Sequence, residues 1–260
     1  MKKFINNLKE LKKHNIVAIK QSLEDEGASF EEIKIMRKIT KKAGLQHNIK
    51  VGGCEAKTDI FFCEKVGVSG IVAPMVETSY GLRKFIQILT NNKRQNLYIN
   101  IESINAFNNI SKILKSKDFK KLTGLVIGRS DLAGSLNLEK SEVDSKRIFK
   151  LVKNLLKKIK KNKKILTKMG GSLTPNSVDF VSKLFKNNLL DRVETRNIEI
   201  KLSNKVLKNF REIIIKIFNF ELEWIKYNQK RNKKSKNKIK NDSISRIKEI
   251  KKRLKNFSNA

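Results

Sequence analysis

Apolar and polar residues along this chain form two alternating kinds of segment. Short apolar runs predict buried strands at 16–19, 48–51, 68–73, 97–101, 122–130, 164–169 and 191–195. Apolar residues spaced three and four apart predict helices at 1–14, 29–44, 55–66, 79–90, 105–114, 143–161, 176–187 and 199–227. Regular alternation of strand and helix indicates a mostly parallel sheet covered by helices.

Seven strands are evident and an eighth is not. We therefore expect an α/β fold of the TIM (β/α)8 type, with the first strand atypical, absent or hidden in residues 1–8. An open, doubly wound sheet is the alternative. The pattern predicts a barrel domain over residues 1–228 and a basic, Lys/Asn-rich C-terminal tail over residues 229–260.

The net charge of +34 invites a nucleic-acid function. Residues 225–260 carry 14 Lys or Arg and 2 Asp or Glu, but the basic excess also continues through the rest of the chain. Lys, Asn and Ile are abundant everywhere, so a general compositional drift explains most of the charge. Only the tail remains a candidate patch for an acidic partner, and nucleic acid is not the first expectation.

Other global features are those of an ordinary cytoplasmic protein. Cys54 and Cys63 show neither a CxxC spacing nor a histidine cluster, so the sequence supports neither a zinc site nor a disulfide framework. Polar residues interrupt the N-terminal segment, and no apolar run reaches the roughly 18 residues of a membrane span.

Two of the predicted strands end in a single carboxylate. Glu102 follows the run 97–101, and Asp131 follows the run 122–130. The carboxyl ends of barrel strands carry the active site in this class of fold. Two acids on successive strands can share one hard cation such as Mg²⁺ or Mn²⁺. A helix-capping or surface acid is the alternative interpretation of each residue alone.

Six segments in order resemble the HpcH/HpaI aldolase and citrate lyase β-subunit family, on a phosphoenolpyruvate/pyruvate-type barrel. They are Leu23-Glu24-Asp25, Lys50 in place of a usual Arg, Asp59, Ile71–Thr78 (IVAPMVET), Ile99–Ser103 (INIES) and Leu125–Ala133 (LVIGRSDLA). The resemblance covers residues 16–136 closely and 137–224 only by pattern.

This resemblance implies a divalent-metal-dependent carbon–carbon lyase, with Glu102 and Asp131 as metal ligands. Its substrate would be a small 2-oxo acid or a CoA thioester, and the protein would form a homo-oligomer. Lys50 or Arg129 would bind the substrate carboxylate as the catalytic cation. Gly128 permits close backbone approach, so we expect the amides of residues 129–131, Arg129 and Ser130 among them, to hydrogen-bond the same carboxylate. Lys supplies a charge without the fork of the family's Arg, which leaves the reaction open.

Alternatives remain open. Lys168 as a Schiff-base lysine would give a different kind of aldolase. Glu24 and Glu26 follow the first strand and are candidates to order a metal-bound water. No general base is evident, since His14 and His47 precede strands and belong at the opposite rim. The second function is a non-catalytic barrel that binds a partner, with its basic tail on an acidic partner or nucleic acid.

Overall fold

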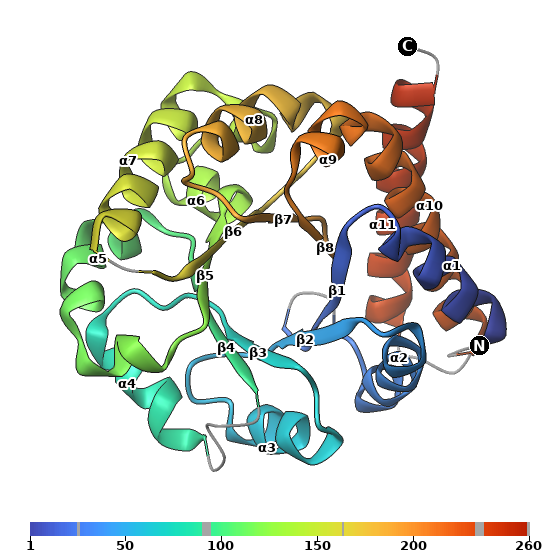
Figure 1. The fold of residues 1–260 in the computed structure, drawn as a ribbon. Coiled ribbons are helices and arrows are strands. Elements are labelled where there is room, and N and C mark those ends of the chain that lie inside the picture. Colours follow the sequence, from blue (N-terminus) through green and yellow to red (C-terminus); the bar gives the residue numbers. More distant parts are fainter. Residues whose placement is uncertain (25–26, 90–94, 163, 232–236, 259–260) are drawn as a thin grey trace.

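The protein, described here from a computed structural model, is a closed eight-stranded barrel surrounded by helices (Figure 1). The structure describes residues 1–24, 27–89, 95–162, 164–231 and 237–258. The strands are β1 (Ile16–Ser22), β2 (Gln46–Lys50), β3 (Gly70–Ala73), β4 (Asn96–Ile101), β5 (Gly124–Gly128), β6 (Leu166–Gly170), β7 (Arg192–Glu194) and β8 (Ile198–Lys201). The barrel prediction is thus confirmed, and the open sheet is excluded.

Helices follow most of the strands and pack outside the barrel. They are α1 (Lys2–Lys12), α2 (Phe30–Ala43), α3 (Lys57–Val66), α4 (Ser79–Ile88), α5 (Ile104–Lys115), α6 (Arg129–Ser135), α7 (Lys146–Asn162), α8 (Val178–Lys186), α9 (Asn204–Lys208), α10 (Phe210–Arg231) and α11 (Asn237–Ser258). Three short 3-10 helices join them, at Lys117–Lys121, Lys140–Asp144 and Pro175–Ser177. Most of the buried apolar side chains lie between these helices and the strands. None of the helices in the described part of the chain combines the length and the hydrophobicity of a membrane span.

The atypical strand is the eighth one, not the first. Residues 2–12 form helix α1, and β1 pairs in parallel with β2 as in a regular barrel. The expectation of a single helix over 199–227 is wrong at its start, because Ile198–Lys201 forms β8, antiparallel to both β7 and β1. Ile198 and Ile200 are buried, and so is Glu199 between them.

The antiparallel β8 changes the route of the chain after the barrel. A tight turn at Thr195–Asn197 joins β7 to β8 at the rim where the parallel strands end, so the chain leaves the barrel at the other rim. The long helix α10 then returns, and α11 packs along it (Figure 1). Residues of the predicted tail therefore lie against the barrel, with Ile250 buried.

Candidate functional site

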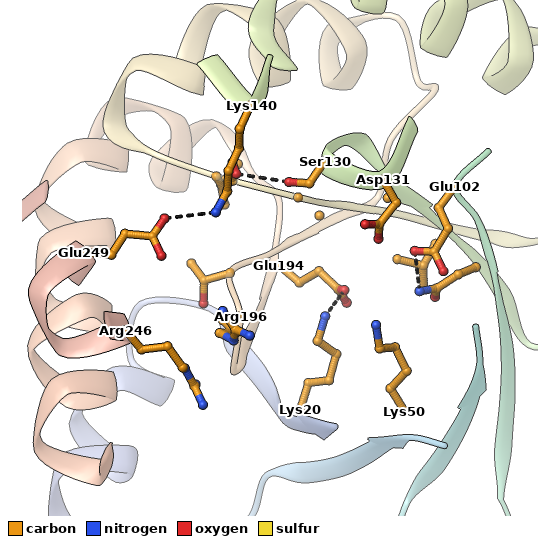
Figure 2. A pocket seen from close by; sticks show the side chains of 18 of the residues that line it. Lys20, Lys50, Glu102, Ser130, Asp131, Lys140, Glu194, Arg196, Arg246 and Glu249 are labelled. Carbon is orange, nitrogen blue, oxygen red and sulfur yellow. Dashed lines mark hydrogen bonds and ion pairs between the residues drawn. The ribbon is translucent and has the colours of Figure 1, made fainter. Parts of the chain in front are cut away.

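A cavity of about 500 Å³ opens at the carboxyl ends of the parallel strands (Figure 2). Residues from the ends of β1, β2, β4, β5, β6 and β7 line it, together with residues of α10 and α11. Glu102 and Asp131, predicted as a pair, both line this cavity. The barrel therefore brings the two strand-end carboxylates into one site.

Glu102 is held in place by neutral donors. Its Oε1 accepts a hydrogen bond from the backbone N–H of Met75 at 3.0 Å, and its Oε2 accepts one from Asn100 Nδ2 at 2.9 Å. Its side chain also packs on Gly128, where a Cβ atom would lie 2.5 Å from Oε2. Only a glycine at position 128 leaves room for the carboxylate in this place.

Asp131 lies in the first turn of α6 and is exposed at the cavity. Its charge acts on Glu102, which is only 3% exposed. The pKa of Glu102 is raised to about 7, first by burial; nearby Lys50 lowers the pKa, and the negative charge of Asp131 raises it further. The negative charge of Asp131 thus opposes the ionisation of Glu102, and a cation bound between them would relieve this repulsion.

The donor set fits a hard divalent cation. Both candidate ligands are carboxylates, and Asn100 Oδ1 is a further buried oxygen in the same cavity without a hydrogen-bond partner. Among the described residues no three His, Cys, Asp or Glu side chains gather as a metal cluster, so the candidate protein ligands are this pair. Mg²⁺ is commonly bound through one or two carboxylates together with waters and substrate oxygens.

Two lysines rise from the floor of the cavity opposite the carboxylates (Figure 2). Lys50, at the end of β2, lines the cavity, as binding of a substrate carboxylate would require. It forms an ion pair with Glu24 at 2.6 Å. Lys20, on β1, forms a close ion pair with Glu194. No motif singles out Lys20 in the sequence, and β1 continues beyond residue 19, where the predicted strand ends.

Arg129 does not lie in the cavity, which corrects its predicted substrate-binding role. Its guanidinium is fully buried and pairs with Asp144, while Nε and Nη2 donate to the carbonyl oxygens of Gly170 and Gly171. Burial lowers the pKa of Arg129, and Asp144 opposes that shift. Through these hydrogen bonds the residue links the start of α6 to the end of β6, outside the cavity.

Gly128 and Ser130 do line the cavity, as predicted. Ser130 Oγ lies 3.0 Å from Ser172 Oγ. Gly171, in the left-handed region at φ 84°, packs so closely that a Cβ there would be 2.5 Å from the Ser130 amide nitrogen. A glycine at 171 thus allows the loop after β6 to cover the start of α6. Amide binding of a substrate by these residues stays a prediction.

The remaining candidates lie elsewhere. Lys168 points into the barrel but is fully buried, with its Nζ 2.8 Å from Glu199 Oε1, and it does not line the cavity. Neither His14 nor His47 lines the cavity. Asp25 and Glu26 lie outside the described residues.

The wall facing the carboxylates was not foreseen from the sequence. It consists of Lys140, Arg196 of the β7–β8 turn, and Arg246, Glu249 and Arg253 of α11. The residues of α11 are three or four positions apart, which places them on one face of that helix. In a tail so rich in Lys and Asn, this spacing carries no visible signal.

Comparisons with known proteins agree with the fold. A crystal structure of an HpcH/HpaI aldolase/citrate lyase family protein from Burkholderia cenocepacia J2315 matches with a TM-score of 0.60 at 12% identity, over 74% of this chain and 82% of that chain. An HpcH/HpaI aldolase from Desulfitobacterium hafniense DCB-2 also gives 0.60, at 11% identity over 74% and 81%. The citrate synthase SbnG gives 0.54 at 14% identity, over 65% and 73%.

At the level of sequence, no curated protein matches this chain. The family model described as HpcH/HpaI aldolase/citrate lyase matches residues 54–167. That segment includes Glu102 and Asp131 together with the strands that precede them, β4 and β5. The match confirms the resemblance inferred from the motifs: residues 54–167 of this barrel are similar to the HpcH/HpaI aldolase/citrate lyase family.

Proposed function

We propose that the protein is a Mg²⁺- or Mn²⁺-dependent carbon–carbon lyase that acts on a 2-oxo acid, free or as part of a CoA-ester substrate. The observation that carries this proposal is the pair Glu102 and Asp131, two mutually opposed carboxylates in one cavity at the strand ends. The family match of residues 54–167 adds the class of reaction, that of aldolases and citrate lyases.

In this proposal Glu102 and Asp131 hold the metal. A divalent ion there would act as a Lewis acid on a keto oxygen, where enolate charge develops as the adjacent carbon–carbon bond breaks or forms. Asn100 and the Met75 amide fix the Glu102 carboxylate by hydrogen bonds. Their role is orientation, because a ligand whose rotamer is already fixed loses less entropy on binding.

The cations on the cavity floor would bind the substrate carboxylate. Lys50 forms an ion pair with Glu24 and acts electrostatically on Glu102, so it lies near the proposed metal site. An ammonium there provides charge at short range without the bidentate geometry of a guanidinium. Lys20 and Glu194 form the neighbouring pair and are candidates for proton transfer.

Exchange of the methyl protons of pyruvate in D₂O, followed by NMR, tests this function without knowledge of the second substrate. We expect the wild-type protein with Mn²⁺ or Mg²⁺ to accelerate exchange, and EDTA to abolish the acceleration. Asp131→Asn should lower the rate by more than roughly a hundredfold, because changes in outer-shell partners alone typically cost tenfold to a hundredfold.

Asp179→Asn is the matched control. Asp179 is also an exposed acid in the first turn of a helix, α8, but it lies outside the cavity. Metal-dependent exchange that survives Asp131→Asn unchanged would refute the proposed ligand set. A wild-type protein that binds metal but catalyses no exchange would favour the alternative function, a non-catalytic barrel that binds a partner. Light scattering tests the predicted homo-oligomer separately.

A further inference from the structure

Helix α7 lies on the outside of the barrel and has the largest excess of positive charge of any described helix (Figure 1). Its 17 residues include eight Lys or Arg and no Asp or Glu. The longer helices α10 and α11 both include acidic residues among their cations. The general abundance of Lys in the chain is therefore most one-sided on α7.

The two faces of α7 differ sharply. The face toward the barrel is apolar, and its buried residues are Ile148, Val152, Leu155, Leu156 and Ile159. On the opposite face Lys146, Lys150, Lys157 and Lys161 are exposed. Their spacings of four, seven and four residues place them in one line along the helix, about 22 Å long at 1.5 Å per residue. We call these four residues the lysine stripe.

The lysine stripe is not neutralised by acidic residues within the described part of the chain, where none of its four side chains forms an ion pair. Two acids near α7 have other partners. Asp191 pairs with Lys160, beside the stripe, at 2.6 Å. Glu142, which precedes α7, accepts a hydrogen bond from the backbone N–H of Glu139 at 3.0 Å. The stripe therefore presents its charge to the solvent.

This arrangement does not stabilise the helix that contains it. Lys146 and Lys150 are four residues apart, and so are Lys157 and Lys161; like charges at this spacing repel each other and destabilise a helix. Lys146 also lies in the first turn, where the helix dipole disfavours a cation. A polyanion bound along the stripe would reverse both effects.

The neighbouring helix α5 widens the charged surface at one end. It contacts α7, and Lys112 and Lys115 in its last turn are exposed. Each of these two helices leads from the end of one parallel strand back to the start of the next, so both end at the amino rim of the barrel. The lysines of α5 and Lys161 thus lie at the rim opposite the one where the cavity opens.

A linear polyanion matches a line of charges better than a flat membrane does. Each strand of a nucleic-acid duplex has one phosphate per 3.4 Å of axis, so the stripe is as long as about six phosphates. A helix that lies in a membrane interface inserts its apolar face, but the apolar face of α7 is buried against the barrel.

The same helix offers no ring to an unpaired base. Phe149, the one aromatic residue in the sequence of α7, packs edge-on against Phe180 with the ring centres 5.0 Å apart. Binding of single strands commonly depends on aromatic rings that stack on the bases. The stripe therefore suits the paired form of nucleic acid, whose phosphates are accessible while its bases are stacked inside.

We propose that the lysine stripe of α7 binds the phosphate backbone of double-stranded nucleic acid, without readout of base sequence. None of its four residues lines the cavity, so this binding surface is independent of the proposed lyase function. It is also distinct from the C-terminal tail, where Glu249 pairs with Lys140 and Arg253 on α11.

Fluorescence anisotropy with a labelled DNA duplex of about 20 base pairs tests the proposal, with full-length protein titrated at several salt concentrations. We expect a dissociation constant in the micromolar range at low salt, and a plot of log affinity against log salt with a slope of at least about −4 in magnitude. K150Q/K157Q/K161Q should reduce the magnitude of this slope by about three, and the affinity at low salt by at least about tenfold.

K248Q/K252Q/K255Q is the matched control, because it removes three charges from exposed positions of α11. A net charge of +34 attracts DNA to any part of the protein, and the control measures this general attraction. We expect it to keep the wild-type slope within about one. If K150Q/K157Q/K161Q unfolds, as judged by circular dichroism, the single variants K150Q and K157Q should each reduce the slope by about one.

A slope that K150Q/K157Q/K161Q leaves unchanged would overturn the proposal, and so would equal reductions by this variant and the control. Two further probes distinguish other occupants of the stripe. A single strand of the same sequence, and vesicles of phosphatidylcholine with phosphatidylserine, should both bind more weakly than the duplex. Tighter binding of either probe, lost in K150Q/K157Q/K161Q, would reassign the stripe to single strands or to an anionic membrane and refute the duplex.

Discussion

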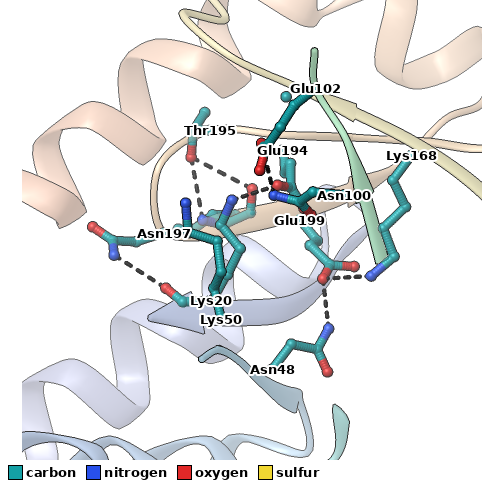
Figure 3. Close-up of polar contacts among 12 residues, drawn as sticks. Lys20, Asn48, Lys50, Asn100, Glu102, Lys168, Glu194, Thr195, Asn197 and Glu199 are labelled. Atoms are coloured by element: carbon teal, nitrogen blue, oxygen red, sulfur yellow. Dashed lines mark hydrogen bonds and ion pairs between the residues drawn. The ribbon is translucent and has the colours of Figure 1, made fainter. Parts of the chain in front are cut away.

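Two clusters of polar and charged groups lie inside this barrel, and they differ in solvent access and in the pairing of their charges. Figure 3 shows Lys168, Glu199 and Asn48 of one cluster and Glu102, Lys50 and Lys20 of the other. One consists of Lys168, Glu199, Arg192 and Asn48. Lys168 and Glu199 are fully buried and 2.8 Å apart, Arg192 Nη1 approaches Glu199 at 3.3 Å, and Asn48 donates to the same carboxylate. The other consists of Glu102, Asp131, Lys50 and Lys20, and all four line the cavity.

We call the first cluster the sealed cluster and the second the open cluster. The comparison distinguishes charged groups that stabilise the fold from charged groups that are suited to bind a ligand. In the sealed cluster each charged group has an opposite partner, and Lys168 Nζ also lies 3.3 Å from the ring centre of Tyr98. In the open cluster two carboxylates oppose each other, and the pKa of Glu102 rises as a result of burial and of that repulsion. Two like charges close together destabilise a folded protein unless a ligand of opposite charge compensates them.

Lys168→Met should give the largest effect, because it leaves Glu199 as a buried charge without its main partner. We expect the free energy of unfolding to fall by about 3–5 kcal/mol. Urea denaturation followed by circular dichroism measures this loss. K168M/E199L should recover part of it, and Lys164→Met, at an exposed position, should cost little. A loss below about 1 kcal/mol for K168M would show that the sealed cluster is not structural.

Asp144→Asn tests the corrected role of Arg129. Asp144 pairs with the buried guanidinium and accepts a hydrogen bond from Ser177 Oγ at 2.7 Å. Its loss should lower the unfolding free energy by about 2 kcal/mol, the scale of a hydrogen bond to a charged group. The free energy of metal binding should change less than the free energy of unfolding. The reverse pattern, with stability kept and 2-oxo acid binding lost, would restore Arg129 as a substrate-binding residue.

Lys50→Gln tests the open cluster itself. Removal of the cation should weaken pyruvate binding in the presence of Mn²⁺ by about tenfold, because one charge-assisted contact is lost. Lys50→Arg should keep most of the affinity, since it keeps the charge. Lys65→Gln, at an exposed position on α3, is the control in the same calorimetric titration. Equal affinities for wild-type protein and K50Q would exclude the proposed role.

His47 gives the smallest effect, at the sealed side of the barrel. It is fully buried on β2, where its Nε2 lies 3.0 Å from Gln21 Oε1, and burial followed by the charge of Arg37 lowers its pKa to about 3. The folded state therefore keeps His47 neutral at pH values where the unfolded chain, with a pKa near 6.5, takes up a proton.

Because the folded pKa is below the unfolded one, stability is complete above about pH 6.5 and decreases as the pH falls toward 3. The loss attributable to His47 should be about 1 kcal/mol between pH 6.5 and 5.5. Urea denaturation at several pH values measures it as the difference between wild-type protein and His47→Gln. Parallel pH dependences for the two proteins would contradict the buried, neutral state.

The sequence predicts most of the barrel because each parallel strand is buried on both faces and reads as an apolar run. Strand β8 escapes prediction for a physical reason. Its buried face toward the barrel interior is Glu199, whose charge is acceptable only beside Lys168 and Arg192, residues distant in sequence. The alternation of Ile198-Glu199-Ile200-Lys201 is typical of a strand, but it is only four residues long and the helical spacing that follows it extends back over the same residues.

The candidate site, like the barrel, is predictable from the sequence only in part. Glu102 and Asp131 are predictable because their position directly after an apolar strand fixes which rim they occupy. Arg129 precedes Asp131 by two residues, yet the turn into α6 directs it away from the cavity, toward Asp144. The wall formed by Lys140, Arg196, Arg246, Glu249 and Arg253 depends on the return of α10 and the packing of α11. Both follow from the antiparallel β8 and not from any local motif.

Binding of Mn²⁺, measured by the loss of the free-ion EPR signal during titration, tests the central claim most directly. The account predicts one site per chain in the wild-type protein and in Asp179→Asn, and its loss or strong weakening in Asp131→Asn and Glu102→Gln. Wild-type binding that both ligand variants retain unchanged would contradict the assignment of this carboxylate pair as the metal site.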